Sequence, residues 1–425
     1  MSEPVTEAID GTPTIRDRAS ALRIIAALRK GSNCLEGVGA FSVGRRVLFG
    51  AATEELDELE LTNGSVVRWL KGRYGHGKTH TFARLMELGY QRNWVTSYVQ
   101  ISLPGQGTEL SRFNEVYSAI VRNCLCRQMV EEEDGQVNPG RRPGWQWILN
   151  QWCQGLRAQA GAAHGDVPTF RLRDVIAQTM TSLQTKLGLS GHFGEALRQY
   201  AIARAESDQD WISVLTAWFQ GEDVHARGGE VRTRLRAAGI RESLTRRNAK
   251  EMLRCFTAFI RYRGFGGLMI MLDEVENVLH GTSKTRREAY TILRELIDNV
   301  DDRHGMTTTC FYAAGTPDLF ESEKGFTEYE ALAERVLLPS GSGHANPRAA
   351  LVDLSRFPLT KDDMVQMAER IIHVYELAKA HTVPDGSRKT IVNLLNASLT
   401  DNPDLNARAW VRKVVDVLDE GIPSS

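Results

Sequence analysis

One stretch near residue 70 restricts the possible folds of this chain more than any other. The pattern Gly72-x-x-x-x-Gly77-Lys78-Thr79 is that of a P-loop. An apolar run at residues 66–70 precedes it and predicts a buried strand, and apolar residues at helical spacing follow it. A glycine-rich turn can match the pattern by chance, but a chance match is not expected to have a strand pattern before it and a helix pattern after it. The sequence therefore predicts a strand, a phosphate-binding loop and a helix in that order.

Each residue type in this loop has a physical role. Gly72, Gly75 and Gly77 let the backbone turn tightly and point successive N–H groups at phosphate oxygens. The helix that follows adds the positive end of its dipole. Lys78 brings a mobile positive charge for the β- and γ-phosphates, and the Thr79 hydroxyl can ligate Mg²⁺. We therefore predict that Lys78 is a catalytic residue and that Thr79 is a metal ligand.

A second pattern supplies carboxylates. Residues 266–272 are two glycines followed by an unbroken apolar run, and Asp273 and Glu274 come directly after it. Such a run predicts a parallel strand that is buried on both faces. Downstream of a P-loop this is the Walker B arrangement. We predict that Asp273 holds Mg²⁺ through water and that Glu274 aligns and deprotonates an attacking water.

Further apolar runs complete the predicted sheet. They lie at residues 94–103, 310–314 and 351–354, while residues 113–129 follow a helical pattern. The predicted fold is therefore α/β with a five-stranded parallel sheet. Thr316 follows the fourth strand, where a polar side chain would lie between Glu274 and the γ-phosphate. Thr316 is thus a sensor candidate; the alternative is that Thr316-Pro317 only begins a turn.

The middle and the end of the chain predict helices alone. Trp145, Trp147 and Trp152 cluster in the middle stretch, where core packing is a better explanation than stacking on a cofactor. The predicted division is an N-terminal helical segment (1–62), a first core part (63–129), a helical insertion (130–250), a second core part (251–356) and a helical lid (357–425).

Composition excludes several classes of protein. The formal net charge is -1, so no global field indicates nucleic-acid or membrane binding. The six cysteines are scattered without a CxxC pair, which favours reduced thiols over disulfides or a zinc site. The polar first ten residues do not resemble a signal peptide, and no apolar run has the length of a membrane span. We expect a cytoplasmic protein that does not enter a membrane.

One local stretch, residues 227–263, is markedly basic. Its cations are Arg227, Arg232, Arg234, Arg236, Arg241, Arg246, Arg247, Lys250, Arg254, Arg261 and Arg263. Such a run could follow the phosphate backbone of double-stranded DNA. The alternative is a solvated helix face that pairs with the acidic residues 131–134.

Taken together, these patterns resemble an AAA+ ATPase. Val43-Gly44-Arg45 looks like the adenine-side box of the Orc/Cdc6 initiator-like ATPases. The stretch Asn406-Ala407-Arg408-Ala409-Trp410-Val411-Arg412 looks like their lid helix, in which Arg408 would contact the γ-phosphate. Initiators usually continue into a winged-helix domain, whereas this chain ends a few turns beyond Arg408, so autonomous sequence-specific DNA binding is not expected.

A narrower resemblance is to the ATP-binding proteins of bacterial BREX-type phage-defence systems. It rests on the loop Gly72-Arg73-Tyr74-Gly75-His76-Gly77-Lys78-Thr79-His80, on Leu272-Asp273-Glu274-Val275-Glu276-Asn277 and on Ala314-Gly315-Thr316-Pro317. Tyr74 and His76 are bulkier than is usual in such a loop. The implied ligands are ATP and Mg²⁺. The implied nucleotide-binding residues are Val43, Gly44, Arg45, Gly72, Tyr74, Gly75, His76, Gly77, Lys78, Thr79, His80 and Arg408.

The resemblance also implies partners. An AAA+ site is completed by an arginine of a neighbouring subunit, and Arg335 is the candidate here, with Arg348 and Arg287 as alternatives. It implies a homo-oligomer formed on ATP or DNA and an Mg²⁺-dependent ATPase that remodels or licenses a DNA-directed assembly. A nucleotide-gated switch with slow turnover is the alternative. A small-molecule phosphotransferase is disfavoured, because the insertion suggests no acceptor pocket.

Overall fold

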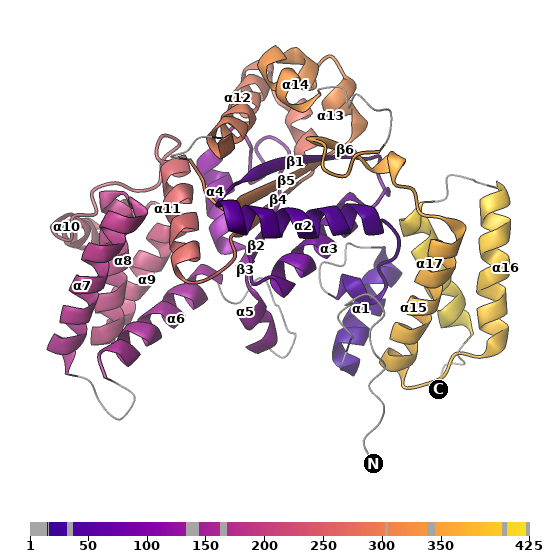
Figure 1. The fold of residues 1–425 in the computed structure, drawn as a ribbon, viewed down its shortest axis with the longest axis horizontal. Helices are drawn as coiled ribbons and strands as arrows, with labels where there is room; N and C mark the ends of the chain where they lie inside the picture. The colour runs from indigo at the N-terminus through magenta and orange to yellow at the C-terminus, as the bar shows by residue number, and fades with distance from the viewer. Residues whose placement is uncertain are drawn as a thin grey trace.

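The structure is a computed structural model that describes residues 15, 17–31, 37–132, 144–161, 168–301, 305–337, 345–401 and 406–421. A six-stranded sheet with the order β3-β2-β4-β5-β1-β6 lies at its centre (Figure 1). The strands are β1 (Val66–Lys71), β2 (Val95–Gln100), β3 (Cys124–Leu125), β4 (Leu268–Asp273), β5 (Thr309–Gly315) and β6 (Leu351–Asp353). All neighbours are parallel except β3, which runs antiparallel to β2.

The predicted α/β fold is confirmed, but the predicted number of strands is wrong. Residues 113–129 do not form one helix, because α4 (Phe113–Arg122) ends before β3, and α5 (Arg127–Glu132) follows. Cys124 and Leu125 pair with Ser97 and Thr96 of β2. Two residues are too few to show the alternation by which a strand is recognised, so tertiary pairing alone defines β3.

Strand order places the two predicted motifs at one edge of the sheet. β5 lies between β4 and β1, and all three run parallel. The P-loop follows β1, and Asp273 is the last residue of β4. Because carboxyl ends of parallel strands meet at the same edge, the loop and the carboxylate come together there.

Helices cover both faces of the sheet, and alternation along β4 decides which side chains meet them. Met269 and Met271 face α2 (Arg46–Thr62) and α3 (Lys78–Gln91). Leu268, Ile270 and Leu272 pack in the other large core, with α4, α11 (Ala249–Tyr262) and α12 (Ser283–Asp301). Every β4 residue is buried, as expected of a central parallel strand.

A group of helices extends from one end of the sheet, at the left of Figure 1. It comprises α6 (Gly144–Gln159), α7 (Thr169–Leu187), α8 (Gly191–Glu206), α9 (Gln209–Phe219) and α10 (Gly229–Ala237). Trp145 lies at its core, with ring centroids 4.7 Å from Phe256 and 5.3 Å from Phe219. Trp145 and Trp152 therefore serve packing, as the sequence indicated.

The C-terminal helices form a separate cluster at the right of Figure 1. It comprises α15 (Lys361–Lys379), α16 (Asp385–Asp401) and α17 (Ala407–Glu420), and α1 (Arg18–Lys30) packs into the same apolar core. Shorter elements are α13 (Pro317–Glu321), α14 (Glu330–Val336), η1 (Val38–Ala40), η3 (Val224–Arg227), η4 (Val275–His280), η5 (Phe326–Glu328) and η6 (Leu354–Arg356). Among the described helices, none has both the length and the apolarity needed to cross a membrane.

Candidate functional site

A cavity of about 690 Å³ opens where β1, β4 and β6 end, between the sheet and the C-terminal helices. One part of its wall is apolar and includes Leu28, Phe41, Met364, Met367 and Val411. The other part is polar and includes the loop from Gly72 to Thr79, together with Asp273, Glu274, Glu276 and Arg408. The cavity therefore offers an apolar end and a charged end, as a nucleotide requires.

The glycine loop has the backbone that its sequence predicts. Gly75 and Gly77 have φ angles of 81° and 83°, a region that side chains disfavour. α3 begins at Lys78, whose Nζ donates to the Gly72 carbonyl at 2.8 Å. Burial lowers the pKa of Lys78, and the nearby carboxylates of Glu276, Asp273 and Glu274 oppose that shift. A buried ammonium with one carbonyl partner is ready to engage phosphate oxygens.

Two predicted metal ligands meet at the charged end. The Thr79 hydroxyl donates to Asp273 Oδ2 at 2.6 Å, although 194 residues separate them. The Tyr98 hydroxyl donates to the same oxygen at 2.9 Å, and Asp273 is 1 % exposed. A hydroxyl and a carboxylate in contact are the oxygen donors that Mg²⁺ takes beside nucleotide phosphates, so these residues fit that ion.

Glu274 is held in an unusual conformation. Its φ of 56° and ψ of 37° are left-handed, which is uncommon for a residue with a side chain. Its carboxylate accepts from Gln100 Nε2 at 2.7 Å and from Asn277 Nδ2 at 3.5 Å. Sequence reasoning missed Gln100, yet a signal was present: it is the polar residue that ends β2, and it pairs in register with Asp273.

Arg45 connects the loop to its surroundings. Its guanidinium donates to the His76 carbonyl at 2.8 Å, to Thr81 Oγ1 at 3.1 Å and to the Phe357 carbonyl at 3.1 Å. Burial lowers the pKa of Arg45 to about 10. Val43 and Gly44, the other residues of the predicted adenine-side box, lie beside it, with Val43 buried and lining the cavity. Arg45 therefore braces the loop, α3 and the segment that leads to α15.

The bulky loop residues are accommodated in different ways. Tyr74 is 73 % exposed and lies under Lys78, whose Nζ is 5.1 Å from the ring centroid. His76 lines the cavity, and burial together with nearby Arg45 lowers its pKa. His80 Nε2 lies 3.0 Å from Ser42 Oγ, and burial lowers the His80 pKa to about 4. His80 is therefore neutral at physiological pH.

The predicted sensor residues take different positions. Thr316 is buried at the start of α13 and is not part of the cavity wall, whereas the adjacent Pro317 is. Arg408 lines the cavity from α17. Asn406 caps α17 by accepting from the Ala409 N–H at 2.9 Å, and it packs so closely on Gly75 that a Cβ there would lie 3.0 Å from Asn406 Cγ. The start of α17 thus touches the glycine loop.

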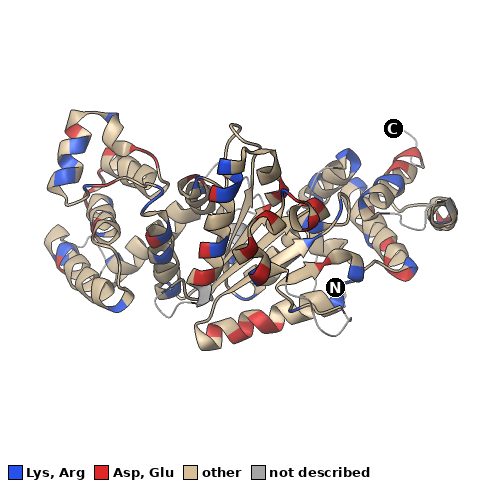
Figure 2. Cartoon of the chain, turned by 90° about the horizontal axis from the view of Figure 1, so that it is seen from above, with Lys and Arg blue, Asp and Glu red and all other residues tan. Residues whose placement is uncertain are grey.

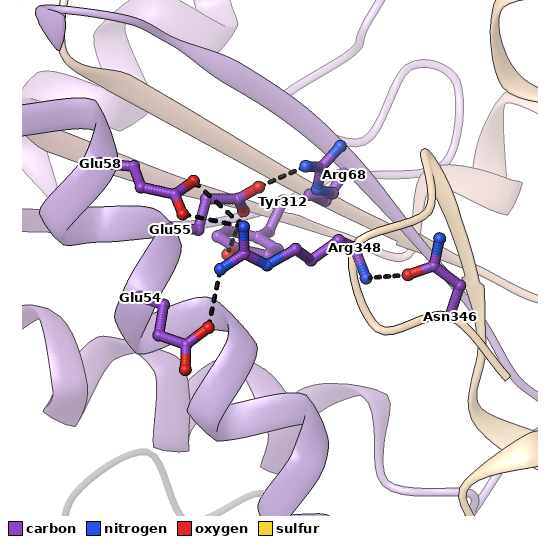
Figure 3. Close-up of polar contacts among 7 residues, drawn as sticks. All are labelled: Glu54, Glu55, Glu58, Arg68, Tyr312, Asn346 and Arg348. Carbon is purple, nitrogen blue, oxygen red and sulfur yellow. Dashed lines mark hydrogen bonds and ion pairs between the residues drawn. The ribbon is translucent and has the colours of Figure 1, made fainter.

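The candidate trans-acting arginines lie outside the cavity wall of their own chain. Arg335 donates to Asp298 at 2.7 Å. Arg348 reaches Glu54 at 2.8 Å and Glu58 at 2.9 Å, both on α2 (Figure 3). Figure 3 also shows the ion pair between the half-buried Arg68 and the buried Glu55, the bond from the Tyr312 hydroxyl to Glu55 and the bond from the Arg348 N–H to Asn346. Arg287 is exposed on α12.

Several cations of the basic stretch have acidic partners within the described residues. Arg234 pairs with Asp208 at 2.7 Å and stacks 4.2 Å from the Trp211 ring. Arg227 pairs with Glu222, and Lys250 with Glu295. Figure 2 accordingly shows both signs of charge on this part of the molecule. The acidic residues 131–134, which the sequence offered as partners, have no described side chains, so that pairing lies outside the described part of the structure.

Fold and site together define a protein class, and the comparisons define a family. The parallel sheet, the glycine loop and the carboxylates at its edge are those of a P-loop NTPase-like protein. A family model described as "BREX system ATP-binding protein BrxC/D" matches residues 15–421, and the chain belongs to this family. The resemblance drawn from the motifs is thereby confirmed, and ATP binding in a BREX defence system follows. A comparison with curated proteins gives no match.

Proposed function

We propose that this protein is an Mg²⁺-dependent ATPase whose cycle remodels or licenses a DNA-directed assembly of BREX defence proteins. The observation that carries the proposal is the 2.6 Å contact between Thr79 and Asp273, with Lys78 beside them on the cavity wall. Motifs far apart in sequence meet at the point where the terminal phosphates of a nucleotide would lie.

The chain's own residues divide the work along the cavity. The apolar end, bounded by Val43, Leu28 and Met364, takes the adenine. Lys78 exchanges the Gly72 carbonyl for phosphate oxygens, and the loop N–H groups hold the phosphates. Thr79 and Asp273 would hold Mg²⁺, which when bound offsets the negative charge of the phosphates. Glu274 aligns the attacking water and accepts its proton.

The C-terminal helices complete this arrangement. Arg408 contacts the γ-phosphate from α17, while Thr316 acts as the sensor behind it. We keep the division predicted from sequence, with residues 357–425 as the lid and 130–250 as an insertion. The separate apolar core of the C-terminal helices supports a lid that moves as a unit, and α1 belongs to that core.

The same proposal includes interactions beyond the chain. Arg335 acts in a neighbouring subunit of a homo-oligomer, and other BREX proteins are the partners. The free thiols of the five described cysteines fit a cytoplasmic location.

Double-stranded DNA would contact the exposed Arg236, Arg241 and Arg247, whose side chains form no ion pair with the described residues. DNA retention should then fall steeply with added salt, and replacing these arginines by alanine should weaken it. Retention that salt does not change contradicts this part of the proposal.

A second candidate function is a nucleotide-gated switch with slow turnover. The observation that favours it is the engagement of Glu274 by Gln100 and Asn277, which occupies one oxygen of the carboxylate needed to activate water. A single retained nucleotide with negligible turnover supports the switch, whereas turnover stimulated by DNA or self-assembly supports the ATPase.

Two substitutions test the ATPase proposal. Lys78→Ala should abolish nucleotide binding, because it removes the positive charge that the glycine loop brings to the β- and γ-phosphates. Glu274→Gln should keep ATP bound but stall turnover, since an amide cannot accept the proton from water. Binding is measured with a fluorescent ATP analogue and turnover by phosphate release. Normal hydrolysis by Glu274→Gln contradicts the assignment of the base.

A further inference from the structure

A buried carboxylate in the cavity wall has no partner. Glu276 lies in η4, is 5 % exposed and lines the cavity beside Glu274. Neither of its carboxylate oxygens has a hydrogen-bond partner within the described residues. A buried acceptor that stays unsatisfied is costly, so such groups in folded proteins usually meet water, an ion or a ligand.

The surroundings of Glu276 show which kind of partner is missing. Burial raises its pKa, and the positive charge of Lys78 acts in the opposite direction. Asp273 and Glu274 are its acidic neighbours, and the Tyr74 hydroxyl of the glycine loop lies near it without the geometry of a hydrogen bond. Lys78 is directed to the Gly72 carbonyl rather than to Glu276.

With Mg²⁺ assigned to Thr79 and Asp273, a group that donates hydrogen bonds at the phosphate end of the cavity would satisfy Glu276. Phosphate oxygens only accept, so the nucleotide itself cannot satisfy Glu276 there. Water donates through both of its hydrogens. Glu274 is also an acceptor at this place, but Gln100 and Asn277 already donate to one of its oxygens.

We propose that Glu276 is a second water-holding residue, which orients the nucleophile together with Glu274. A water that donates one hydrogen to each carboxylate points a lone pair away from both, toward the γ-phosphorus. Its oxygen then bonds to that phosphorus as the bond to the β,γ-bridging oxygen breaks, and its proton goes to Glu274. The inference rests on the proposed ATPase function and adds a residue to it.

A water-holding role and a structural role predict different consequences for Glu276→Gln. The amide keeps the shape but removes the charge and one acceptor, so the water is held less well. Turnover should fall roughly 10- to 100-fold, the scale of a misplaced reactant. The midpoint of thermal unfolding should stay unchanged or rise, because a buried carboxylate without a partner is lost. A structural residue would instead lower that midpoint.

The experiment measures three quantities for the full chain: single-turnover hydrolysis of ATP with enzyme in excess, the Kd values for ADP and ATPγS, and the unfolding midpoint. Glu276→Asp should restore part of the rate by returning the charge. The control is Glu323→Gln, which removes the same charge from an exposed position outside the cavity wall and should behave as wild type.

Each outcome decides the matter. Slow hydrolysis by Glu276→Gln with unchanged Kd values and an undiminished midpoint supports the inference. A wild-type rate overturns it, and so does a rate loss that follows weakened nucleotide binding or a lowered midpoint. Absence of hydrolysis by the wild-type protein overturns the ATPase proposal as well, which separates that failure from the failure of Glu276 alone.

Discussion

The cavity wall and the predicted helical insertion (residues 130–250) differ in where they place charged side chains. At the cavity, charged groups are buried in positions that cost stability: Lys78 with one carbonyl partner, Glu276 with none, and Glu274 in a left-handed backbone. In the insertion, aromatic rings fill the core around Trp145, while charges such as Arg234 remain at the surface beside acids.

The contrast lies in buried charge: among its described residues the insertion buries no charged side chain, although the indole N–H groups of Trp145 and Trp152 also have no partner. Unsatisfied polar groups and strained backbone persist only where a surrounding fold holds them, and they are common at functional sites. The insertion contains none of the residues that line the cavity, and its apolar side chains share one core with the sheet. Substitutions in the two regions should therefore act on different quantities.

The largest expected effect concerns a residue in neither region. Arg335→Ala should lower turnover about 10³-fold or more, roughly 4 kcal/mol, because a trans-acting arginine stabilises the charge of the transition state. Nucleotide affinity should not change. Arg294→Ala is the matched control, since Arg294 pairs with the same Asp298.

A mixing experiment locates the arginine. Lys78→Ala subunits keep Arg335 but cannot bind nucleotide. Arg335→Ala subunits keep the nucleotide site but lack the arginine. Phosphate release from the mixture should exceed that of either variant alone. If Arg335→Ala turns over ATP normally, or mixing restores nothing, Arg335 is not the residue that acts in trans.

In the insertion, Trp145→Ala should destabilise the fold without altering the site. Trp145 is fully buried against Phe256 and Phe219, so its loss should cost about 3–5 kcal/mol of unfolding free energy. Urea unfolding measures this cost, and the Kd for ADP should be unchanged in the folded protein. Trp147→Ala, at a half-buried position, should cost less; an equal cost contradicts the assignment of the core.

Behind the glycine loop, His80 should make stability depend on pH. Its pKa is about 4 in the folded protein against an ordinary 6.5, so the unfolded chain binds the extra proton first as pH falls. Stability should therefore decrease between pH 6.5 and 4, by up to about 3 kcal/mol. In denaturant titrations, His80→Gln should lose less stability at acid pH than the wild-type protein does, whereas His381→Gln, at an exposed position, should behave as wild type. Equal acid sensitivity in all three proteins contradicts the burial argument.

On the insertion surface, Arg234→Ala should have the smallest effect. The Arg234–Asp208 pair is exposed and the Trp211 contact adds little, so about 1 kcal/mol or less of stability should be lost. Turnover should be unchanged. A loss comparable to that of Trp145→Ala, seen in the same urea titration, removes the distinction between core and surface of the insertion.

The same two regions show how far sequence reasoning extends. The α/β fold and the family followed from short motifs because a glycine loop and an apolar strand ending in carboxylates each have one common structural context. Thr79 and Asp273 were predicted as metal ligands from the P-loop and Walker B motifs; the structure brings them into contact, and their roles stay predictions. The division into domains stays a prediction as well.

The features that could not be predicted from the sequence depend on contacts between distant segments. The two-residue strand β3 exists only through pairing with β2. The bond from Gln100 to Glu274 needs the register of β2 and β4, and the isolation of Glu276 needs every neighbour in place. The packing of α1 with the C-terminal helices likewise crosses the whole chain. No local periodicity encodes such arrangements.

The central claim is that the terminal phosphates and their Mg²⁺ lie where Lys78, Thr79 and Asp273 converge. It is tested most directly by the affinity for ATPγS with and without Mg²⁺, measured for the wild-type protein and for Asp273→Asn. The account predicts that Mg²⁺ tightens binding to the wild-type protein about tenfold or more, and that Asp273→Asn loses most of this gain. An equal Mg²⁺-dependent gain in both proteins would contradict it.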